Sequence, residues 1–440
     1  MHLLPPLIVI ILAVFISYEH EAINAQYVPP YTSIVVPLTK HTDVAKPLYS
    51  VQIMTSYVNS RFLTANFLVD IDAPFIWHDC IVQWNIYPGS CPNNTLCTSP
   101  VSCEEYQCTD VRTSYSYENP SCAPETNGST LPGWGFCTCP VNVVNPITRS
   151  CTQALLNYDE FTVSTSNGRN VFTGLYGAYP NAACANSTSF ESFPANVNGV
   201  MAFSTSPYAL PAYLFEPLKK TLALCLPSNS TDPGVLFVGS GPYYLLPNSD
   251  VDLRSLLSYT PLLKHPDSYG YYIGLKSIVV KSKSIDIPGN LSTKLSTLEP
   301  YTILRTDIYN RVIKAFSVAT LGLHRARPVT PFGLCYKWLA NLGSTHAGFK
   351  FPDIDLSFED GKKWRVYMAN SMKRVTKKVA CLAFVDGGAT AEHAVVIGTH
   401  QLEDNFLVFD LQNSTFGFSS SLLREQTSCS NFNFTITDGN

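Results

Sequence analysis

Cysteine constrains this 440-residue chain more than any other residue type: there are fourteen cysteines, and nine of them lie between Cys80 and Cys151. A zinc site is the alternative to disulfides, since Cys137 and Cys139 flank Thr138 and other cysteines lie nearby. The spacings do not form a pair of Cys-x-x-Cys knuckles, however. An even count in an exported chain favours disulfides. We therefore expect up to seven disulfides, no free thiol and no metal site.

The N-terminal stretch MHLLPPLIVIILAVFISYEHEAINAQ predicts that the chain is exported. Its apolar run has the length of a signal peptide and is followed by small and polar residues, so we expect cleavage near Ala25. The run is short for a bilayer and lacks basic flanks, which argues against a membrane anchor. Residues 1–25 are thus expected to be a signal peptide, and the mature protein to be secreted and extracellular, in the apoplast or cell wall if the source is a plant.

Seven Asn-x-Ser/Thr sequons predict surface glycosylation of an exported chain. They begin at Asn93, Asn127, Asn186, Asn229, Asn290, Asn413 and Asn433. Only 14% of the residues are charged and the net charge is -4, so no basic footprint for nucleic acid is present. We expect a monomer or weak oligomer with no nucleic-acid partner and no cofactor.

Short apolar or alternating runs rich in β-branched and aromatic residues dominate the chain, for example GVLFVGSG, YYIGLKSIVVKS and NFLVFDLQ. Helical periodicity is rare. The clearest case is RTDIYNRVIKAFSVATLG, with Ile308, Val312, Ile313 and Phe316 on one face and Thr306 as the expected N-cap. The pattern predicts a mostly β protein with a few short helices, and the length suits two lobes.

Two acids interrupt an apolar strand in FLVDIDAPFIWHDC, at Asp70 and Asp72. This stretch resembles the first active-site strand of pepsin-like aspartic proteases, in which an apolar strand leads to Asp-Thr-Gly and then to a Trp. Asp70 takes the place of the catalytic Asp, while Ile71 replaces Thr and Asp72 replaces Gly. In KLSTLEPYTILRTDIY, Ser296 falls where the second catalytic Asp belongs.

The resemblance implies a bilobal pepsin-like aspartic protease fold, mostly β with a few short helices. The expected N-terminal lobe spans residues 26–244 and carries a Cys-rich insertion over 80–151, and the C-terminal lobe spans residues 245–440. Asp70 and Ser296 should face each other across the floor of the cleft. NPITRSC lies where active relatives carry the flap motif Tyr-Gly-Asp-Gly.

The tail VACLAFVDGGATAEHAVVIGTHQLEDNFLVFDLQNSTFGFSSSLL narrows the resemblance. It is similar to the plant basic 7S globulin and extracellular dermal glycoprotein group, which includes xyloglucanase inhibitors and, more distantly, xylanase inhibitors. These proteins share the pepsin-like fold with inactivated catalytic motifs. The resemblance also implies the disulfides Cys335–Cys381 within the second lobe and Cys225–Cys429 tying back the tail.

Aspartic proteolysis needs two carboxylates that share one proton and hold one water. Ser296 cannot supply the second, so Asp70 and Ser296 are expected to be vestigial and no residue catalytic. Asp72 would then be tolerated because the site no longer has to work. An Asp70–Asp72 glycosidase pair lacks opposed carboxylates.

A metal site at His393, His400 and Glu403 is the remaining chemical alternative in the tail. Their spacing in EHAVVIGTHQLEDN matches no zinc pattern. We therefore expect structural roles for these three side chains and no bound metal.

The leading functional hypothesis is a secreted, inactive homologue that inhibits or recognises microbial cell-wall-degrading glycoside hydrolases, either endoglucanases or xylanases. A basic side chain entering a carboxylate-lined cleft would gain from desolvated charge pairing. Arg424 in SLLREQTSC is the first candidate, although Glu425 stands where relatives carry the basic residue. Arg325 and Arg327 form a second basic loop. The alternatives are a divergent active aspartic endopeptidase and a seed-storage-like or peptide-binding globulin.

Overall fold

The computed structural model describes residues 31–437, apart from 58–60, 84–90, 93–94, 114–136, 216–217, 219, 249, 267, 290 and 339–350. The signal peptide expected over residues 1–25 and the sequons at Asn93, Asn127 and Asn290 lie outside the described residues. Thr32–Asn440 group into one compact unit, and the lobe boundary expected between residues 244 and 245 stays a prediction.

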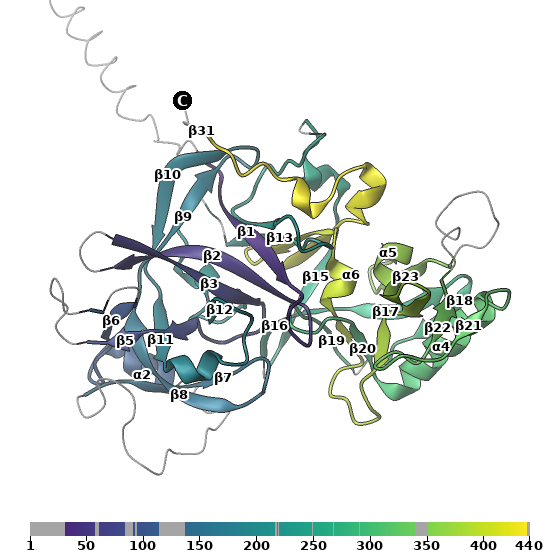
Figure 1. Ribbon diagram of the computed structural model, residues 1–440, viewed down its shortest axis with the longest axis horizontal. Helices are drawn as coiled ribbons and strands as arrows, with labels where there is room; N and C mark the ends of the chain where they lie inside the picture. Colours follow the sequence, from purple (N-terminus) through teal and green to yellow (C-terminus); the bar gives the residue numbers. More distant parts are fainter. Residues whose placement is uncertain are drawn as a thin grey trace, which may run out of the picture. The chain divides into compact units, whose positions relative to one another are not determined.

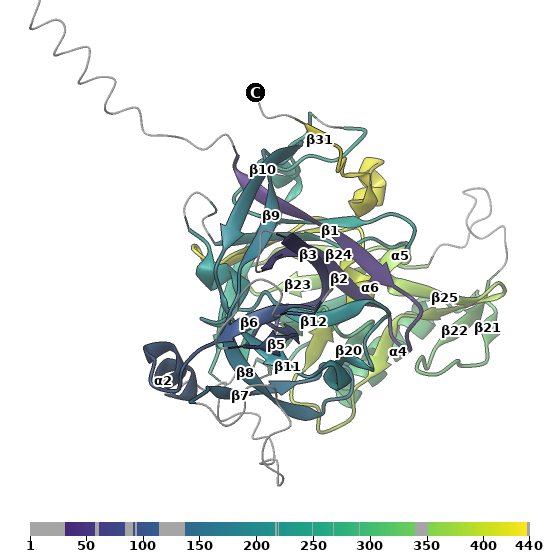
Figure 2. The ribbon, with the colours of Figure 1, turned by 60° about the vertical axis from the view of Figure 1, so that its left-hand side comes forward.

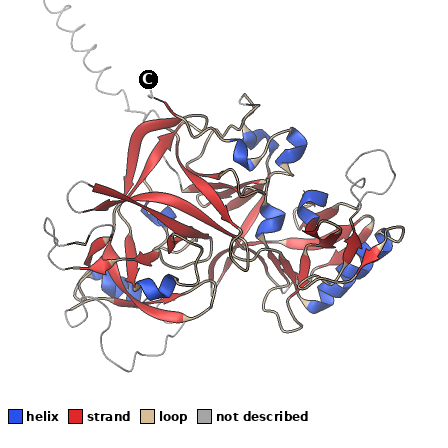
Figure 3. Cartoon of the chain, viewed as in Figure 1, coloured by secondary structure: helices blue, strands red, loops and turns tan. Residues whose placement is uncertain are grey.

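The molecule is mostly β, as the strand pattern predicts (Figures 1 and 3). Its first three strands, β1 (Ser33–His41), β2 (Leu48–Tyr57) and β3 (Arg61–Asp70), form an antiparallel meander that is also visible in Figure 2. The parallel partner of β3 is β12 (Val197–Ala202). Because the second part of β3 lies between β2 and β12, residues 67–70 are buried and Asp70 ends the strand in the interior.

A continuous sheet joins the beginning of the chain to its end. Its order is β1, β14 (Gly234–Val238), β13 (Thr221–Cys225), β29 (Phe406–Asp410), β30 (Thr415–Phe418) and β15 (Ser258–His265). All five residues of β13 and all five of β14 are buried, which is why these strands read as continuous apolar runs. Phe237, Tyr243, Phe406 and Phe432 pack into one core against this sheet.

The remaining strands of the first half include a hairpin that reaches over the Asp70 region, β7 (Pro140–Val144) with β8 (Cys151–Tyr158). The other elements there are β4 (Trp77–Asp79), β5 (Ile81–Val82), β6 (Cys97–Pro100), α2 (Tyr106–Thr113), β9 (Phe161–Ser166), β10 (Val171–Ala178), β11 (Asn181–Ala185), η1 (Ser187–Phe190) and η2 (Leu210–Tyr213). The short helix η3 (Leu253–Leu256) follows after residue 244.

In the second half, Ser296 follows directly on β19 (Thr293–Leu295), which lies between β16 (Ser268–Ile273) and β28 (Val395–Ile397). The strands that complete this layer are β20 (Thr302–Leu304) and β27 (Phe384–Asp386). Two four-stranded sheets accompany it, in the orders β18 (Lys283–Asp286), β17 (Leu275–Val280), β23 (Ile354–Phe358), β24 (Lys363–Val366) and β21 (Arg325–Ala326), β22 (Cys335–Lys337), β26 (Val379–Leu382), β25 (Met372–Thr376). The short elements are α5 (Met368–Ser371), α6 (Thr399–Leu402), η5 (Leu422–Glu425), η6 (Cys429–Asn431) and β31 (Ile436–Thr437).

The helix predicted from the 3.6-residue period is α4 (Thr306–Ala319), and Ile308, Val312 and Phe316 are buried along it. The N-cap prediction was wrong by one residue. Arg305 occupies the cap without a side-chain cap bond, and the Thr306 hydroxyl instead donates to the Asp386 carboxylate at 2.6 Å. A competing acceptor on a neighbouring strand thus replaces the local cap.

Disulfides pin both halves. The structure pairs Cys225 with Cys429 and Cys335 with Cys381, the two pairings that the family resemblance implies. The other pairs given by the structure are Cys80–Cys184, Cys91–Cys97, Cys103–Cys137 and Cys108–Cys139. No cysteine is free in the described part of the chain, and no cluster of three or more potential metal ligands occurs there. Among the described helices, none has the length and apolarity to cross a membrane.

Candidate functional site

Asp70 lies at the end of β3 with only 6% of its surface exposed. Its carbonyl accepts the Phe203 N–H at 2.8 Å, which fixes the end of β3 against the end of β12. Its Oδ1 accepts the Asp72 N–H at 2.8 Å. Burial raises the pKa of the Asp70 carboxyl to about 6, and the negative charge of Asp72 adds to the effect. Asp70 is thus a buried carboxyl that changes its charge in mildly acidic solution.

The segments that carry Asp70 and Ser296 meet through Thr297. Its buried hydroxyl donates to the Val69 carbonyl at 2.7 Å and accepts the Ile71 N–H at 3.4 Å. Ser296 itself turns inward on its own loop, where its Oγ accepts the N–H groups of Leu298 and Glu299 at 3.2 and 3.1 Å. The structure therefore brings the two motif segments together, but the hydroxyl of Ser296 is engaged by backbone amides.

Asp72 links the two segments by charge. Its Oδ2 lies 2.5 Å from the Lys294 ammonium, two residues before Ser296, and its Oδ1 accepts the Ser268 hydroxyl at 3.0 Å. Burial would lower the pKa of Lys294, but the carboxylate of Asp72 outweighs burial and raises it. Asp72 therefore holds a cation from the second half of the chain. That the acid is tolerated because the site no longer has to work stays a prediction.

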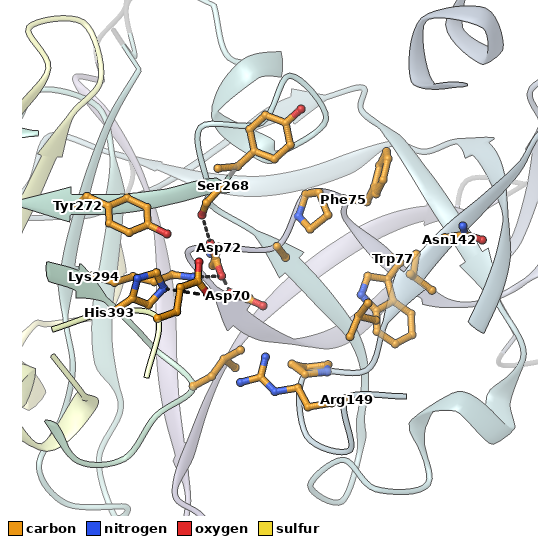
Figure 4. Close-up of a pocket in the computed structure, with 18 residues that line it drawn as sticks. Asp70, Asp72, Phe75, Trp77, Asn142, Arg149, Ser268, Tyr272, Lys294 and His393 are labelled. Atoms are coloured by element: carbon orange, nitrogen blue, oxygen red, sulfur yellow. Dashed lines mark hydrogen bonds and ion pairs between the residues drawn. The ribbon is translucent and has the colours of Figure 1, made fainter. Parts of the chain in front are cut away.

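A pocket of about 340 Å³ opens beside these residues (Figure 4). The floor carries Asp70, Asp72 and Lys294, and the β7–β8 hairpin supplies Asn142 and Arg149. Arg149, at the hairpin turn, makes a 3.3 Å ion pair with Glu299, so the hairpin is tied to the Ser296 loop. The other lining side chains include Phe75, Trp77, Tyr269, Tyr272, Glu392 and His393.

The pocket offers one buried carboxyl beside an Asp–Lys ion pair. A proton-sharing dyad needs two carboxyls in contact, and the second acid at hand, Asp72, is already neutralised by Lys294. His393 at the rim is held by Ser292, whose Oγ lies 2.8 Å from Nδ1, and burial lowers its pKa. The arrangement suits holding a ligand better than activating water.

The two other residues weighed as metal ligands lie elsewhere. His400 Nδ1 is 3.3 Å from Glu403 Oε2, and Glu403 Oε1 is 2.7 Å from the buried Lys40 ammonium and 2.8 Å from the Tyr49 hydroxyl. This is a buried ionic cluster between β1, β2 and the α6 turn. Sequence reasoning did not find Lys40 or Lys294, since nothing local marks a lysine whose partner is more than two hundred residues away.

The basic candidates are outside the pocket and on different elements. Arg424 is exposed in η5, and its guanidinium carbon lies 4.7 Å from the centre of the Tyr367 ring. Arg325 and Arg327 are exposed around β21, where the Arg325 guanidinium donates to the Ser317 hydroxyl of α4. Of the sequons, the asparagines in the described part are all exposed, namely Asn186, Asn229, Asn413 and Asn433. Their occupancy stays a prediction.

Comparison with known proteins gives the family of the chain. The family model described as Xylanase inhibitor N-terminal matches residues 53–240, and that described as Xylanase inhibitor C-terminal matches residues 270–420. The chain is 33% identical to Probable aspartic proteinase GIP2 of Nicotiana benthamiana, over 91% of this chain and 92% of that protein. It is 33% identical to Gamma conglutin 1 of Prunus dulcis, over 90% and 89%.

Solved structures give the same answer for the fold. The crystal structure of edgp superimposes with a TM-score of 0.76 at 31% identity, covering 93% of this chain and 100% of that one. Conglutin gamma, a basic 7S globulin from lupine seeds, gives a TM-score of 0.76 at 25% identity with the same coverage. The chain therefore belongs to the xylanase-inhibitor-like family with a pepsin-like fold, which also contains the basic 7S globulins and gamma conglutins.

Proposed function

We propose that this protein is a secreted, non-hydrolytic recognition protein that binds and inhibits cell-wall-degrading glycoside hydrolases of microbes, endoglucanases or xylanases. The observation that carries the proposal is the residue at the place of the second catalytic Asp of pepsin-like proteases. There, Ser296 accepts two backbone N–H groups, in a chain whose two halves match xylanase-inhibitor models. A scaffold that no longer needs a catalytic dyad retains its disulfide-pinned loops for binding.

The electrostatics of the pocket support the non-hydrolytic part. Peptide hydrolysis requires a base that takes the proton of water and an acid that serves the carbonyl. With Asp72 paired to Lys294, the Asp70 carboxyl has no free acidic partner beside it on the floor.

Peptidase assays at acid pH test this part directly. We expect the purified protein to cleave no peptide, and Asp70→Ala to change nothing. Ser296→Asp alone should not restore cleavage, because Ile71, Asp72 and Lys294 would still shape the floor. Pepstatin-sensitive cleavage by the wild-type protein that disappears in Asp70→Ala would overturn the proposal and support a divergent endopeptidase.

The binding part rests on exposed basic side chains of the second half. Glycoside hydrolase clefts carry carboxylates, so a guanidinium that enters one is desolvated against opposite charge, the kind of contact that forms interface hot spots. Arg424 is pre-oriented on Tyr367, which lowers the entropy cost of ordering it, but Glu425 beside it works against an acidic cleft. Arg325 and Arg327 have no acidic neighbour in sequence from 321 to 337.

Inhibition assays against a panel of xylanases and xyloglucanases test this part. For an inhibited enzyme, Arg424→Ala should weaken binding by about 2 kcal/mol if Arg424 enters the cleft, and the double variant Arg325→Ala/Arg327→Ala should do so if the second loop enters. Arg169→Ala, in the first half, is the matched control and should leave binding unchanged. No inhibition across the panel would refute the proposal.

A further inference from the structure

One end of the four-stranded sheet β21–β22–β26–β25 carries a group of exposed basic side chains that does not line the candidate site (Figure 2). The Lys337 N–H donates to the His324 carbonyl at 2.8 Å. The Trp338 N–H donates to the Lys378 carbonyl at 2.7 Å. The Arg374 guanidinium donates to a carbonyl of the β25–β26 turn at 3.3 Å. We call this group the basic end, and it consists of His324, Arg325, Lys337, Arg374, Lys377 and Lys378.

No acid close in sequence compensates the charge of the basic end. Residues 308–352 and 361–385, the two segments that form the sheet, contain no Asp or Glu, although the whole chain has a net charge of -4. Residues 339–350, which lie outside the described residues, are included in this count. Within the described residues, no ion pair involves a side chain of the basic end. The acids that border the two segments each interact with a group outside the basic end, and they are Asp307, Asp353, Asp360 and Asp386.

The cations are spread over both faces of the sheet. Arg325 pairs with Tyr336 of β22, which pairs with Ala380 of β26, which in turn pairs with Arg374 of β25. Cross-strand partners share a face, so Arg325 and Arg374 lie on one face and Lys337 on the other. Adjacent strands lie about 4.8 Å apart, so the basic end spans several strand widths. An extended polyanion can contact these cations in succession, whereas one small anion cannot.

An indole adjoins the basic end. Trp338 directly follows β22 and is half-buried. Within the described residues, its ring makes no aromatic contact and its side chain no hydrogen bond. An amphipathic ring that is partly open to solvent is typical of binding surfaces. Beside cations, such a ring suits a sugar, because the C–H groups of the sugar pack on the indole while its carboxylate reaches the basic side chains.

We propose that the basic end binds an acidic polysaccharide, a polyuronate, with successive carboxylates on its guanidinium and ammonium groups and a sugar ring on Trp338. The relatives described above come from plants, whose cell walls contain polyuronates, and this chain is expected to be exported. Guanidinium groups bind carboxylates through two parallel N–H bonds. Each exposed ion pair is weak, so the affinity comes from the number of contacts along one polymer. This contact holds the exported protein on the wall matrix.

Binding of the full-length protein to immobilised polygalacturonate tests the proposal, with fully methyl-esterified polygalacturonate as the uncharged control polymer. We expect the ester to bind at least about tenfold more weakly, because it has lost the carboxylates. Added salt should weaken the binding of polygalacturonate, since exposed ion pairs are screened. Equal binding of the ester, or no binding of polygalacturonate, would overturn the proposal. Binding to phosphatidylserine vesicles but not to polygalacturonate would also overturn it and indicate a membrane surface instead.

Variants locate the site. Lys377→Gln/Lys378→Gln should weaken polygalacturonate binding at least about fivefold, because two ion pairs are lost. Lys281→Gln/Lys283→Gln, on the exposed β17–β18 hairpin, removes the same charge and should bind like the wild type. Trp338→Leu should weaken the binding of polygalacturonate but not that of polyacrylate, which has carboxylates and no rings. Equal weakening in the two lysine variants, or unchanged polygalacturonate binding in Trp338→Leu, would refute the assignment. Glycoside hydrolase inhibition enters none of these measurements.

Discussion

The ion pair of Asp72 with Lys294 depends on a glycine at position 270. A Cβ built on Gly270 of β16 would lie 2.4 Å from Asp72 Oδ1 and 3.1 Å from the Cε of Lys294. The glycine therefore makes room for the ion pair that joins the two motif segments. The motif resemblance identified Asp70 and Ser296, but it gave no sign of Gly270 or Lys294, because the pairing of Asp72 depends on the folded approach of β16 and β19.

Gly270→Ala should consequently displace the Asp72 carboxylate and lower the free energy of unfolding by about 2 kcal/mol, as overpacking does. In an Asp72→Ala background the same change should cost much less, since the clashing carboxylate is gone. Denaturant unfolding of the four members of this cycle measures the coupling. Gly289→Ala, where a Cβ meets nothing within 4 Å, is the control. Additive losses would contradict the steric explanation.

A second residue-scale pair lies in the first half, away from the pocket. His78 Nε2 is 2.6 Å from Asp159 Oδ2, and both side chains are almost fully buried. Burial lowers the pKa of His78, but the Asp159 carboxylate outweighs it and raises the pKa above its ordinary value of 6.5. The charged pair therefore contributes its full stability below pH 6.5, and the contribution is lost as the pH rises through the folded-state pKa.

Asp159→Asn should thus cost about 3 kcal/mol of unfolding free energy at pH 5.5, where it leaves a buried imidazolium without its partner. At high pH the loss should shrink to about 1 kcal/mol, the value of a neutral hydrogen bond. Unfolding curves of both proteins across this pH range give the comparison. Asp250→Asn, which changes an exposed acid outside this pair, serves as the control. A cost that grows with pH would have the wrong sign.

At the scale of elements, the sequence predicted strands and the one long helix well, because periodicity is a local signal. It placed α4 correctly and missed its cap, since the Thr306 hydroxyl prefers Asp386 of β27, a partner eighty residues away. The pairing of strands could not be read from local patterns. Only the family resemblance implied that the tail, with η5, η6 and β31, returns to β13 through Cys225–Cys429.

That disulfide predicts how the tail behaves. Cys225→Ser/Cys429→Ser should lower the free energy of unfolding by about 4 kcal/mol, because the bond closes a very long loop of the unfolded chain. Limited proteolysis of the native protein should then cut within residues 422–437 before any other described segment. Cys91→Ala/Cys97→Ala, which opens a loop of sequence separation 6, is the comparison and should cost less. Equal losses would argue against the tether.

On the scale of the whole molecule, a buried ionic cluster connects strands β1 and β2 to Glu403, the residue that follows α6. Lys40 of β1 bonds Glu403 and the Ser228 carbonyl, both at 2.7 Å, while Tyr49 of β2 reaches the same carboxylate. Burial would raise the pKa of Glu403, but the hydrogen bond from His400 and the charge of Lys40 outweigh it, and the pKa falls below its ordinary value of 4.5. Its contribution is present above pH 4.5 and is lost as the pH falls further.

Lys40→Met should therefore destabilise the protein by about 3 kcal/mol at pH 7, because Glu403 remains buried and charged without its cation. Lys40→Met/Glu403→Leu should recover much of the loss by removing both charges. Thermal unfolding of the single and double variants shows whether the loss comes from the unpaired charge of Glu403 or from lost packing of the Lys40 side chain. Lost packing predicts that the double variant is no more stable than the single one. Lys46→Met, which removes an exposed partner of Glu299, should change stability by less than about 1 kcal/mol.

The sheet that joins the two ends of the chain also has a consequence for biosynthesis. The outer neighbour of β13 is β29, which leaves the ribosome only near the end of synthesis. Until then one edge of β13 presents a row of unpaired N–H and C=O groups, a template for strands of other nascent chains. During synthesis, every molecule passes through this state before β29 pairs with β13. A chain truncated before residue 406 lacks β29, so the edge of β13 stays unpaired and we expect the chain to aggregate.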